Sequence, residues 1–224
     1  MEPLQPDISY HIFNHANGFE NIFREAENYR YFLEKYQLYI SPIAETYAYC
    51  LMPNHFHLVI RIRKREAIEK LINNLNSKNS TRTTFPKVQN FGKDENNFRD
   101  SEIEKYLSKQ FANLFSCYTQ SFNKMYHRMG SMFIKNFKRE PIHDKEHFLN
   151  AVIYTHRNPI HHHFREKYLD WDYSSYFDIV HETSKVVNTN KVLKVFIDKN
   201  QFINLHLENL QKFKFFDKPE NHDP

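Results

Sequence analysis

Two histidines separated by one residue, in the run His55-Phe56-His57, are the first side chains whose spacing could support chemistry. The run HFHLVIRI around them is rich in β-branched and aromatic residues and predicts a strand over residues 55–62. Side chains alternate between the two faces of a strand, so His55 and His57 share one face and Phe56 points to the other. Two imidazoles on one face can chelate a divalent ion. Two solvated histidines on an exposed face are the structural alternative.

A second set of candidate side chains recurs at helical spacing. Asn150, Tyr154 and Asn158 are four residues apart and would lie along one face of a helix. If that face covers the strand over 55–62, Tyr154 comes close to the histidine pair, and the amide oxygen of Asn158 could be a third metal ligand. The structural alternatives are a core ring for Tyr154 and a helix C-cap for Asn158. His156 would point away from Tyr154, which makes it a poor general base for that residue.

The limits of this helix can be predicted from its capping and proline residues. Asp144 is a typical N-cap, and Pro159 should end the helix at about Arg157, because the residue before a proline avoids helical geometry. The three consecutive histidines at 161–163 cannot all face one ion from a regular element. We therefore predict a solvated turn there, or contacts to phosphate when the rings are protonated.

The charge of the chain suits a polyanionic partner without requiring one. The formal net charge is +4, with 14 histidines left out of the sum. A charge run is usually a solvated face, but basic residues here flank both candidate segments. Arg157 or Lys138 could also favour the ionised form of Tyr154, since a free tyrosine has a pKa of about 10. The candidate contacts to nucleic acid are Arg61, Arg63, Lys64, Lys135, Lys138, Arg139 and Arg157.

Composition argues against several classes of protein. The chain has 3 glycines, too few and too scattered for a phosphate-binding P-loop or a dinucleotide fingerprint, so we expect no nucleotide cofactor. Cys50 and Cys117 lack CxxC spacing and are predicted to be buried, reduced thiols. The N-terminal segment MEPLQPDISY has no apolar signal region, and no apolar run approaches the length of a membrane span. We therefore expect a cytoplasmic protein.

The remaining patterns predict an α+β domain. An aromatic stripe at steps of three and four predicts a long helix over 101–127. The β-rich runs 46–51 and 55–62, joined by a turn, predict an antiparallel hairpin. The polar stretch 76–100 indicates a long flexible insertion. The other predicted elements are a strand at 9–15, a short strand or loop at 132–139, and helices at 20–40, 65–75 and 192–216. This order favours an antiparallel sheet with helices on one face.

Several motifs, in this order, resemble one family. MPNHFHLVI is followed by FNKMYHRMGSMF, YTHRNPI and WDYSSY, and together they resemble the REP-associated tyrosine transposases, which are HUH-type single-strand transposases of insertion sequences. The resemblance runs from near Tyr10 to about Tyr176, with 76–100 outside it. It implies a ferredoxin-like or RRM-like antiparallel sheet with helices packed on one face and a catalytic helix near the histidine strand. The transposase-like domain would span residues 8–180, followed by a helical tail of unknown role over 181–224.

The resemblance also implies a role for each candidate residue. His55 and His57 correspond to the metal ligands, and Tyr154 corresponds to the nucleophile. Asn158 matches a polar residue that completes the metal site. The implied function is a metal-dependent single-stranded DNA endonuclease and strand transferase. It would act on hairpin-containing DNA with Mg²⁺ or Mn²⁺, through a 5′-phosphotyrosine intermediate, as a monomer or homodimer.

Two functional alternatives and one structural alternative remain open at this point. The fold could persist as a nucleic-acid-binding module that has lost its chemistry. The same metal site could belong to a phosphodiesterase that uses water as the nucleophile, with Tyr154 in a structural role. A purely structural protein would leave the paired histidines unexplained.

Overall fold

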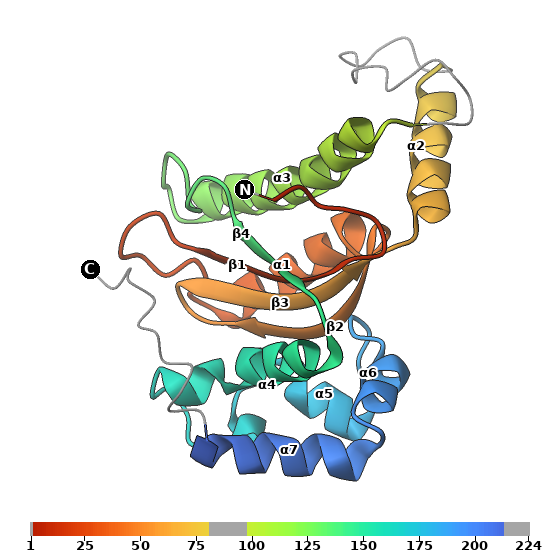
Figure 1. Ribbon diagram of the computed structural model, residues 1–224. Coiled ribbons are helices and arrows are strands. Elements are labelled where there is room, and N and C mark those ends of the chain that lie inside the picture. The colour runs from red at the N-terminus through yellow and green to blue at the C-terminus, as the bar shows by residue number, and fades with distance from the viewer. Residues whose placement is uncertain (1, 81–97, 213–224) are drawn as a thin grey trace.

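The computed structural model describes residues 2–80 and 98–212, which form an antiparallel sheet covered by helices (Figure 1). Within these residues the sheet has four strands in the order β2-β3-β1-β4. The strands are β1 (Ser9–His15), β2 (Ala44–Leu51), β3 (His55–Ile62) and β4 (Lys138–Ile142). The helices are α1 (Ala26–Tyr39), α2 (Arg65–Ser80), α3 (Asp100–Met125), α4 (Lys145–His161), α5 (Ser175–His181), α6 (Thr189–Val195) and α7 (Lys199–Lys212), with a 3-10 turn at Tyr168–Asp170.

Helices lie on both faces of this sheet. On one face, Phe56 of β3 packs against Phe32 of α1 and Phe115 of α3, with ring centroids 5.4 and 5.8 Å apart. On the other face, Tyr47 of β2 packs edge-on against Phe148 of α4 at 4.9 Å. Figure 1 shows α3 and α4 on opposite sides of the strands.

The predicted α+β class and antiparallel sheet are confirmed, and α4 lies next to the histidine strand as expected. The helices were predicted on one face, and the structure instead places them on both. The reason lies in the central strand β3, where every residue except Arg61 is buried. A strand that is buried on both faces needs a helical layer on each side.

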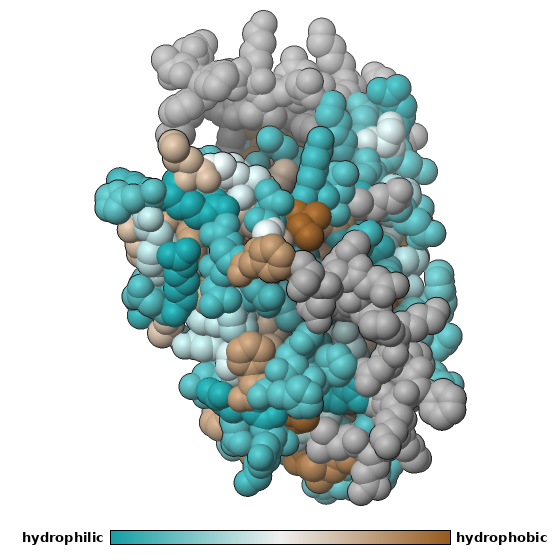
Figure 2. Space-filling view, turned by 90° about the vertical axis from the view of Figure 1, so that its left-hand side faces the viewer, coloured by the Kyte–Doolittle hydropathy of each residue, from teal (hydrophilic) through white to brown (hydrophobic). Residues whose placement is uncertain are grey.

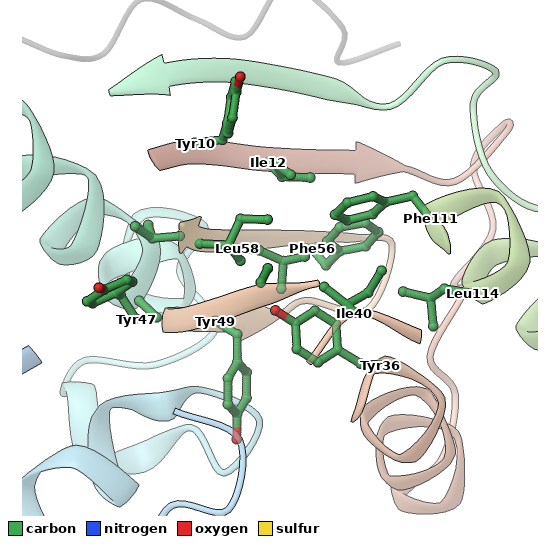
Figure 3. Close-up of a cluster of buried hydrophobic side chains, with 14 of the residues drawn as sticks. Tyr10, Ile12, Tyr36, Ile40, Tyr47, Tyr49, Phe56, Leu58, Phe111 and Leu114 are labelled. Carbon is green, nitrogen blue, oxygen red and sulfur yellow. The ribbon is translucent and has the colours of Figure 1, made fainter. Parts of the chain in front are cut away.

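Aromatic rings fill the core between the sheet and the α1–α3 layer. Figure 3 shows Phe56 and Leu58 of β3 together with Tyr36 of α1 and Phe111 of α3, and all four side chains are 0% exposed. Tyr118 and other ring-bearing residues of the long helix α3 are also buried. The aromatic stripe predicted for this helix is therefore core, because rings at steps of three and four face one side.

Helix α4 begins as predicted but ends later. Asp144 is the N-cap, and its carboxylate accepts a hydrogen bond from the backbone N–H of His147 at 2.8 Å. The prediction that Pro159 ends the helix at Arg157 is wrong, since the helix continues through the proline to His161. Pro159 cannot donate a helical hydrogen bond and its ring crowds the preceding turn, and the helix ends only two residues after it.

Two predicted segments are only partly described. Helix α2 extends to Ser80, so residues 76–80 of the predicted flexible insertion are helical, and residues 81–97 lie outside the described part of the chain. The predicted helical tail at 192–216 corresponds to two helices, α6 and α7, with residues 213–216 again outside. The proposed boundary between a domain at 8–180 and a tail at 181–224 stays a prediction.

The last strand lies later in the chain than its prediction at 132–139. Phe133 makes a single bridge to Ala16, and regular pairing with β1 begins only at Lys138. The strand includes Pro141, which cannot donate a ladder hydrogen bond. It is accommodated because β4 is an edge strand with one neighbour.

Two smaller expectations concern membranes and thiols. No helix among the described residues is long and apolar enough to cross a membrane. Cys50 and Cys117 are free thiols, as predicted, with Cys50 buried and Cys117 partly buried.

The ring core gives a test of the fold. Phe32 is fully buried, with the rings of Phe23 and Tyr118 both at 5.3 Å. We expect Phe32→Ala to lower the free energy of unfolding by about 3–5 kcal/mol, because it removes buried area and leaves a cavity. Urea denaturation measures this change. Phe19→Ala is the matched control, since Phe19 is 81% exposed and its loss should change stability by less than about 0.5 kcal/mol. Equal effects of the two substitutions would contradict this core.

Candidate active site

The histidine pair lies at the start of β3, on the sheet face covered by α4. His55 is 3% exposed and His57 is 0% exposed, so the alternative of a solvated strand face is excluded. Phe56 points into the opposite layer, as strand alternation predicts. On the neighbouring strand β1, His15 is the register partner of His55, and the two rings stack at 4.8 Å.

Helix α4 brings the second set of candidates to the same place. The amide oxygen Oδ1 of Asn158 lies 3.2 Å from Nε2 of His55. The Tyr154 ring lies edge-on to His57 with centroids 5.5 Å apart. Asn158 also donates from Nδ2 to the backbone carbonyl of Tyr154 at 3.1 Å, which fixes its amide orientation. The structure therefore brings all four residues together, and their chemical roles stay predictions.

His57 has one nitrogen engaged and one without a partner. Its Nδ1 lies 3.0 Å from Nε2 of His11, whereas its Nε2 is buried and has no hydrogen-bond partner among the described residues. Burial lowers the pKa of His57 well below its usual range, and the nearby rings of His11 and His55 lower it further. The ring is therefore neutral at pH 7, and a neutral imidazole is the form that binds a cation.

The surroundings of His55 fit a cation as well. Its Nδ1 lies 2.8 Å from Oδ1 of Asn54. When Nδ1 donates to Asn54, Nε2 is an acceptor that faces another acceptor, Oδ1 of Asn158. A divalent ion bound by both lone pairs would stabilise two acceptors at this distance. Two ligand atoms bonded at right angles to one ion at about 2.1 Å lie about 3 Å apart.

These groups define what a metal site here could contain. In the described part of the chain no group of three or more His, Cys, Asp or Glu side chains is placed to hold a metal ion. A cation at this place would instead have two imidazole nitrogens and the amide oxygen of Asn158, with its other positions open to outside oxygens. The partnerless Nε2 of His57 supports this fit, because a buried nitrogen without a partner is costly.

Residues 5–101 of the chain match the family model described as "Transposase IS200 like". This segment, somewhat under half of the chain, is similar to the IS200-like transposases. The resemblance predicted from the motifs is confirmed by this match. The transposase segment runs from just before β1 to just after the start of α3, so it carries His55 and His57. Tyr154 and Asn158 lie beyond its end.

The chain is also similar to a solved structure described as "Structure of the REP associates tyrosine transposase bound to a REP hairpin". The two chains are 13% identical, with a TM-score of 0.49, and the similarity covers 83% of this chain and 87% of the other. No curated protein matches the chain.

Three histidines near the transposase motif were not predicted as site residues. His11 and His15 lie on β1 and face the histidine pair, and their spacing in HIFNH resembles that of HFH. The same alternation rule applied to this strand could have identified them. His162 was predicted in a solvated turn. It caps α4, is partly buried, and its ring lies 5.0 Å from that of His55.

Several of the predicted DNA contacts have partners inside the protein. Arg157 is 7% exposed on α4. Arg139 is half-buried on the α1–α3 face of the sheet, because its register partner is Ile12, whose own partner on β3 is Leu58. The internal partners are the carboxylate of Asp7 for Arg61 at 3.0 Å, the carbonyl of Ser41 for Arg63 at 2.9 Å, and the hydroxyl of Ser108 for Arg139 at 3.1 Å.

Lys64, Lys135 and Lys138 are exposed. Lys138 is the register partner of Phe13, which is in turn the partner of His57, so Lys138 and His57 share one face of the sheet. Lys64 follows the far end of β3, about 30 Å along the strand from its first residue. Lys138 is therefore better placed than Lys64 to contact a DNA strand bound at the histidines. DNA binding stays a prediction for all seven basic residues.

A second buried polar network holds the far side of α4. His206 of α7 donates from Nδ1 to the carbonyl of Phe202 at 2.7 Å, so its Nε2 accepts from Nδ1 of His156 at 2.9 Å. Nε2 of His156 then accepts from the hydroxyl of Ser175 at 2.8 Å, and Ser175 accepts from the backbone N–H of Tyr49 at 2.9 Å. His156 therefore points away from Tyr154, as predicted, and ties α4 to α5, α7 and β2.

This network predicts a loss of stability in mild acid. Burial lowers the pKa of His156 well below its usual range and that of His206 to about 3, whereas both titrate near pH 6.5 in the unfolded chain. Below pH 6.5 the unfolded chain therefore binds more protons than the folded one. Each histidine should lower the free energy of unfolding by up to about 1.4 kcal/mol per pH unit, measured by urea denaturation from pH 7.5 to 5.0 in EDTA.

Two variants test the assignment to these rings. His206→Gln removes one buried titrating group and should make the decline with pH shallower. His143→Gln, at an exposed position, should leave the slope unchanged. A free energy of unfolding that stays flat between pH 7.5 and 5.0 would rule out neutral buried histidines.

Proposed function

We propose that this protein is a metal-dependent single-stranded DNA endonuclease and strand transferase that acts on hairpin-containing DNA. The observation that carries the proposal is the position of α4. This helix lies outside the segment matched to the IS200-like transposases, yet it places Tyr154 at 5.5 Å from the His57 ring and Asn158 against His55. A nucleophile and a possible ligand thus meet the family's histidine pair from a distant part of the chain.

The side chains suited to hold the cation are His55, His57 and Asn158. Each presents a nitrogen or oxygen lone pair, and burial keeps His57 neutral. When bound, Mg²⁺ or Mn²⁺ would act as a Lewis acid on the scissile phosphate. The low exposure of these side chains limits competing water, which strengthens electrostatic interactions at the site.

Tyr154 acts as the nucleophile in this proposal. Its phenolic oxygen forms a bond to phosphorus as the bond to the 3′ oxygen breaks, leaving a 5′-phosphotyrosine and a free 3′-OH that carries away the proton. A second 3′-OH reverses these steps and restores the tyrosine, so strands are joined without a nucleotide cofactor. Positive charge favours loss of the phenolic proton, and Lys138 on the same sheet face can supply it.

Charge around the site supports a DNA strand as the substrate. The sequence from residue 124 to 139 contains five Lys or Arg residues and no Asp or Glu, and it leads from the end of α3 into β4. Arg128 pairs with Glu20 and Arg139 bonds to Ser108, whereas Lys124, Lys135 and Lys138 are exposed. Ile134 in this segment donates its backbone N–H to the carbonyl of His15 at 3.0 Å, so the segment lies beside the histidines. Figure 2 shows the surface at this end, which is largely hydrophilic with separate hydrophobic side chains. Both features suit phosphate contacts and base stacking.

We expect the protein to act in the cytoplasm, as a monomer or homodimer.

The nucleophile can be tested by trapping the covalent intermediate. We expect wild-type protein, mixed with Mn²⁺ and labelled single-stranded hairpin DNA from beside its own gene, to give a shifted band on a denaturing gel. The band should disappear in Tyr154→Phe and in EDTA, because the phenolic oxygen and the cation are both required. Tyr39→Phe, on α1, is the matched control and should keep the band.

The other outcomes point to different functions. Cleavage that survives Tyr154→Phe would favour a water nucleophile and a phosphodiesterase. Salt-sensitive binding to every hairpin tested, with neither cleavage nor adduct, would favour a binding module.

DNA contacts can be tested through their salt dependence. We expect the double variant Lys135→Gln/Lys138→Gln to bind single-stranded DNA more weakly and to reduce the slope of log affinity against log salt by about 1.4, since each phosphate contact contributes about 0.7. Fluorescence anisotropy at several salt concentrations measures this slope. Lys167→Gln, at another exposed position, should leave it unchanged. A double variant with the wild-type slope would remove these lysines from the DNA surface.

A further inference from the structure

We infer that His11 is a positioning residue that sets the tautomer of His57, with Glu140 behind it. The inference rests on the proposed function, because it concerns the nitrogen that His57 would offer to a metal. Three side chains from three neighbouring strands form the chain of contacts. Glu140 is on β4, His11 is on β1 and His57 is on β3.

The register of the sheet brings these groups together. Glu140 is the register partner of His11, so their side chains lie on the same face. Oε2 of Glu140 lies 3.9 Å from Nδ1 of His11. Nε2 of His11 lies 3.0 Å from Nδ1 of His57, and the two rings are nearly parallel, at an interplanar angle of 11°. His11 is 8% exposed, and it also meets the Tyr154 ring edge-on at 5.8 Å.

Between two neutral imidazoles only one nitrogen of the contact can donate. If His57 donates from Nδ1, His11 accepts at Nε2 and carries its own proton on Nδ1, where it faces the carboxylate of Glu140. In that arrangement Nε2 of His57 keeps its lone pair.

The reverse arrangement is unfavourable at both ends. If His11 donates from Nε2, its Nδ1 presents a lone pair to the carboxylate of Glu140. His57 would then carry its proton on Nε2, which has no acceptor among the described residues. A buried donor without an acceptor is destabilising. The contact between His11 and Glu140 and the lack of an acceptor at Nε2 of His57 therefore both favour the tautomer of His57 whose Nε2 can bind a cation.

This arrangement is the protein part of a carboxylate–histidine–metal chain, extended by one ring. In metal sites, the outer group that accepts from a ligating histidine fixes the ring and raises its basicity. His11 is the outer group that accepts from Nδ1 of His57, and Asn54 is the outer group that accepts from Nδ1 of His55. The signal in the sequence is the histidine on β1 that shares a face with the pair.

The test reads the tautomer directly, in metal-free protein. We expect ¹⁵N chemical shifts of labelled histidine to show His57 protonated on Nδ1 in the wild type. His11→Phe keeps a ring but removes the acceptor, so it should shift His57 towards protonation on Nε2. It should also weaken Mn²⁺ binding by about 10- to 100-fold in isothermal titration calorimetry. His11→Gln supplies a carbonyl acceptor, so it should restore most of the Nδ1 protonation of His57 and most of the Mn²⁺ affinity.

Further variants keep the test decisive. Glu140→Gln alters only the exposed end of the chain of contacts, so it should fold normally and weaken the tautomer preference. Glu166→Gln is its exposed control and should have no effect. The inference is overturned if wild-type His57 is protonated on Nε2, or if its tautomer does not change in His11→Phe and Glu140→Gln. Failure of the wild type to bind Mn²⁺ would instead reject the proposed metal chemistry, and the tautomer would still decide the role of His11.

Discussion

The burial of two imidazoles on the central strand β3 is the constraint on which the rest of the site depends. Their four ring nitrogens are polar, and a buried polar atom without a partner costs about 1–3 kcal/mol. Two of the four, the Nδ1 atoms of the two rings, have hydrogen-bond partners in Asn54 and His11. Of the other two, Nε2 of His55 faces the amide oxygen of Asn158, and Nε2 of His57 has no hydrogen-bond partner among the described residues. A cation bound there would complete the set, which is why this cluster is better explained by chemistry than by packing alone.

Helix α4 can supply Tyr154 and Asn158 only because its other faces are held in place. Its N-terminus is capped by Asp144, and its far side is joined through His156 to α7 and α5. Helices that the sequence suggested as a separate tail thus support the candidate site. Phe196 and Phe202 from this region are almost fully buried in the same core. This side of α4 is held in place because both ring nitrogens of His156 have hydrogen-bond partners.

Sequence patterns predicted some elements closely and others poorly. The strands at 9–15 and 55–62 were predicted with their observed bounds, and α3 to within two residues, because their periodicities are long or unbroken. Helix α1 begins at Ala26 rather than near residue 20, since Ile22 and Phe23 are buried from a loop and mimic helical spacing. Periodicity identifies buried residues, but it does not show which kind of backbone buries them.

The sequence by itself determined which residue types could do chemistry and that His55 and His57 share a strand face, because side-chain alternation is a local property of the backbone. The tertiary structure alone decided that this face is buried and that α4 lies across it. It also decided that His11 contacts His57, while Arg61 and Arg63 have partners within the protein. These outcomes depend on strand register and helix docking between segments far apart in the chain. Such contacts follow from packing the whole core, and no local spacing specifies them.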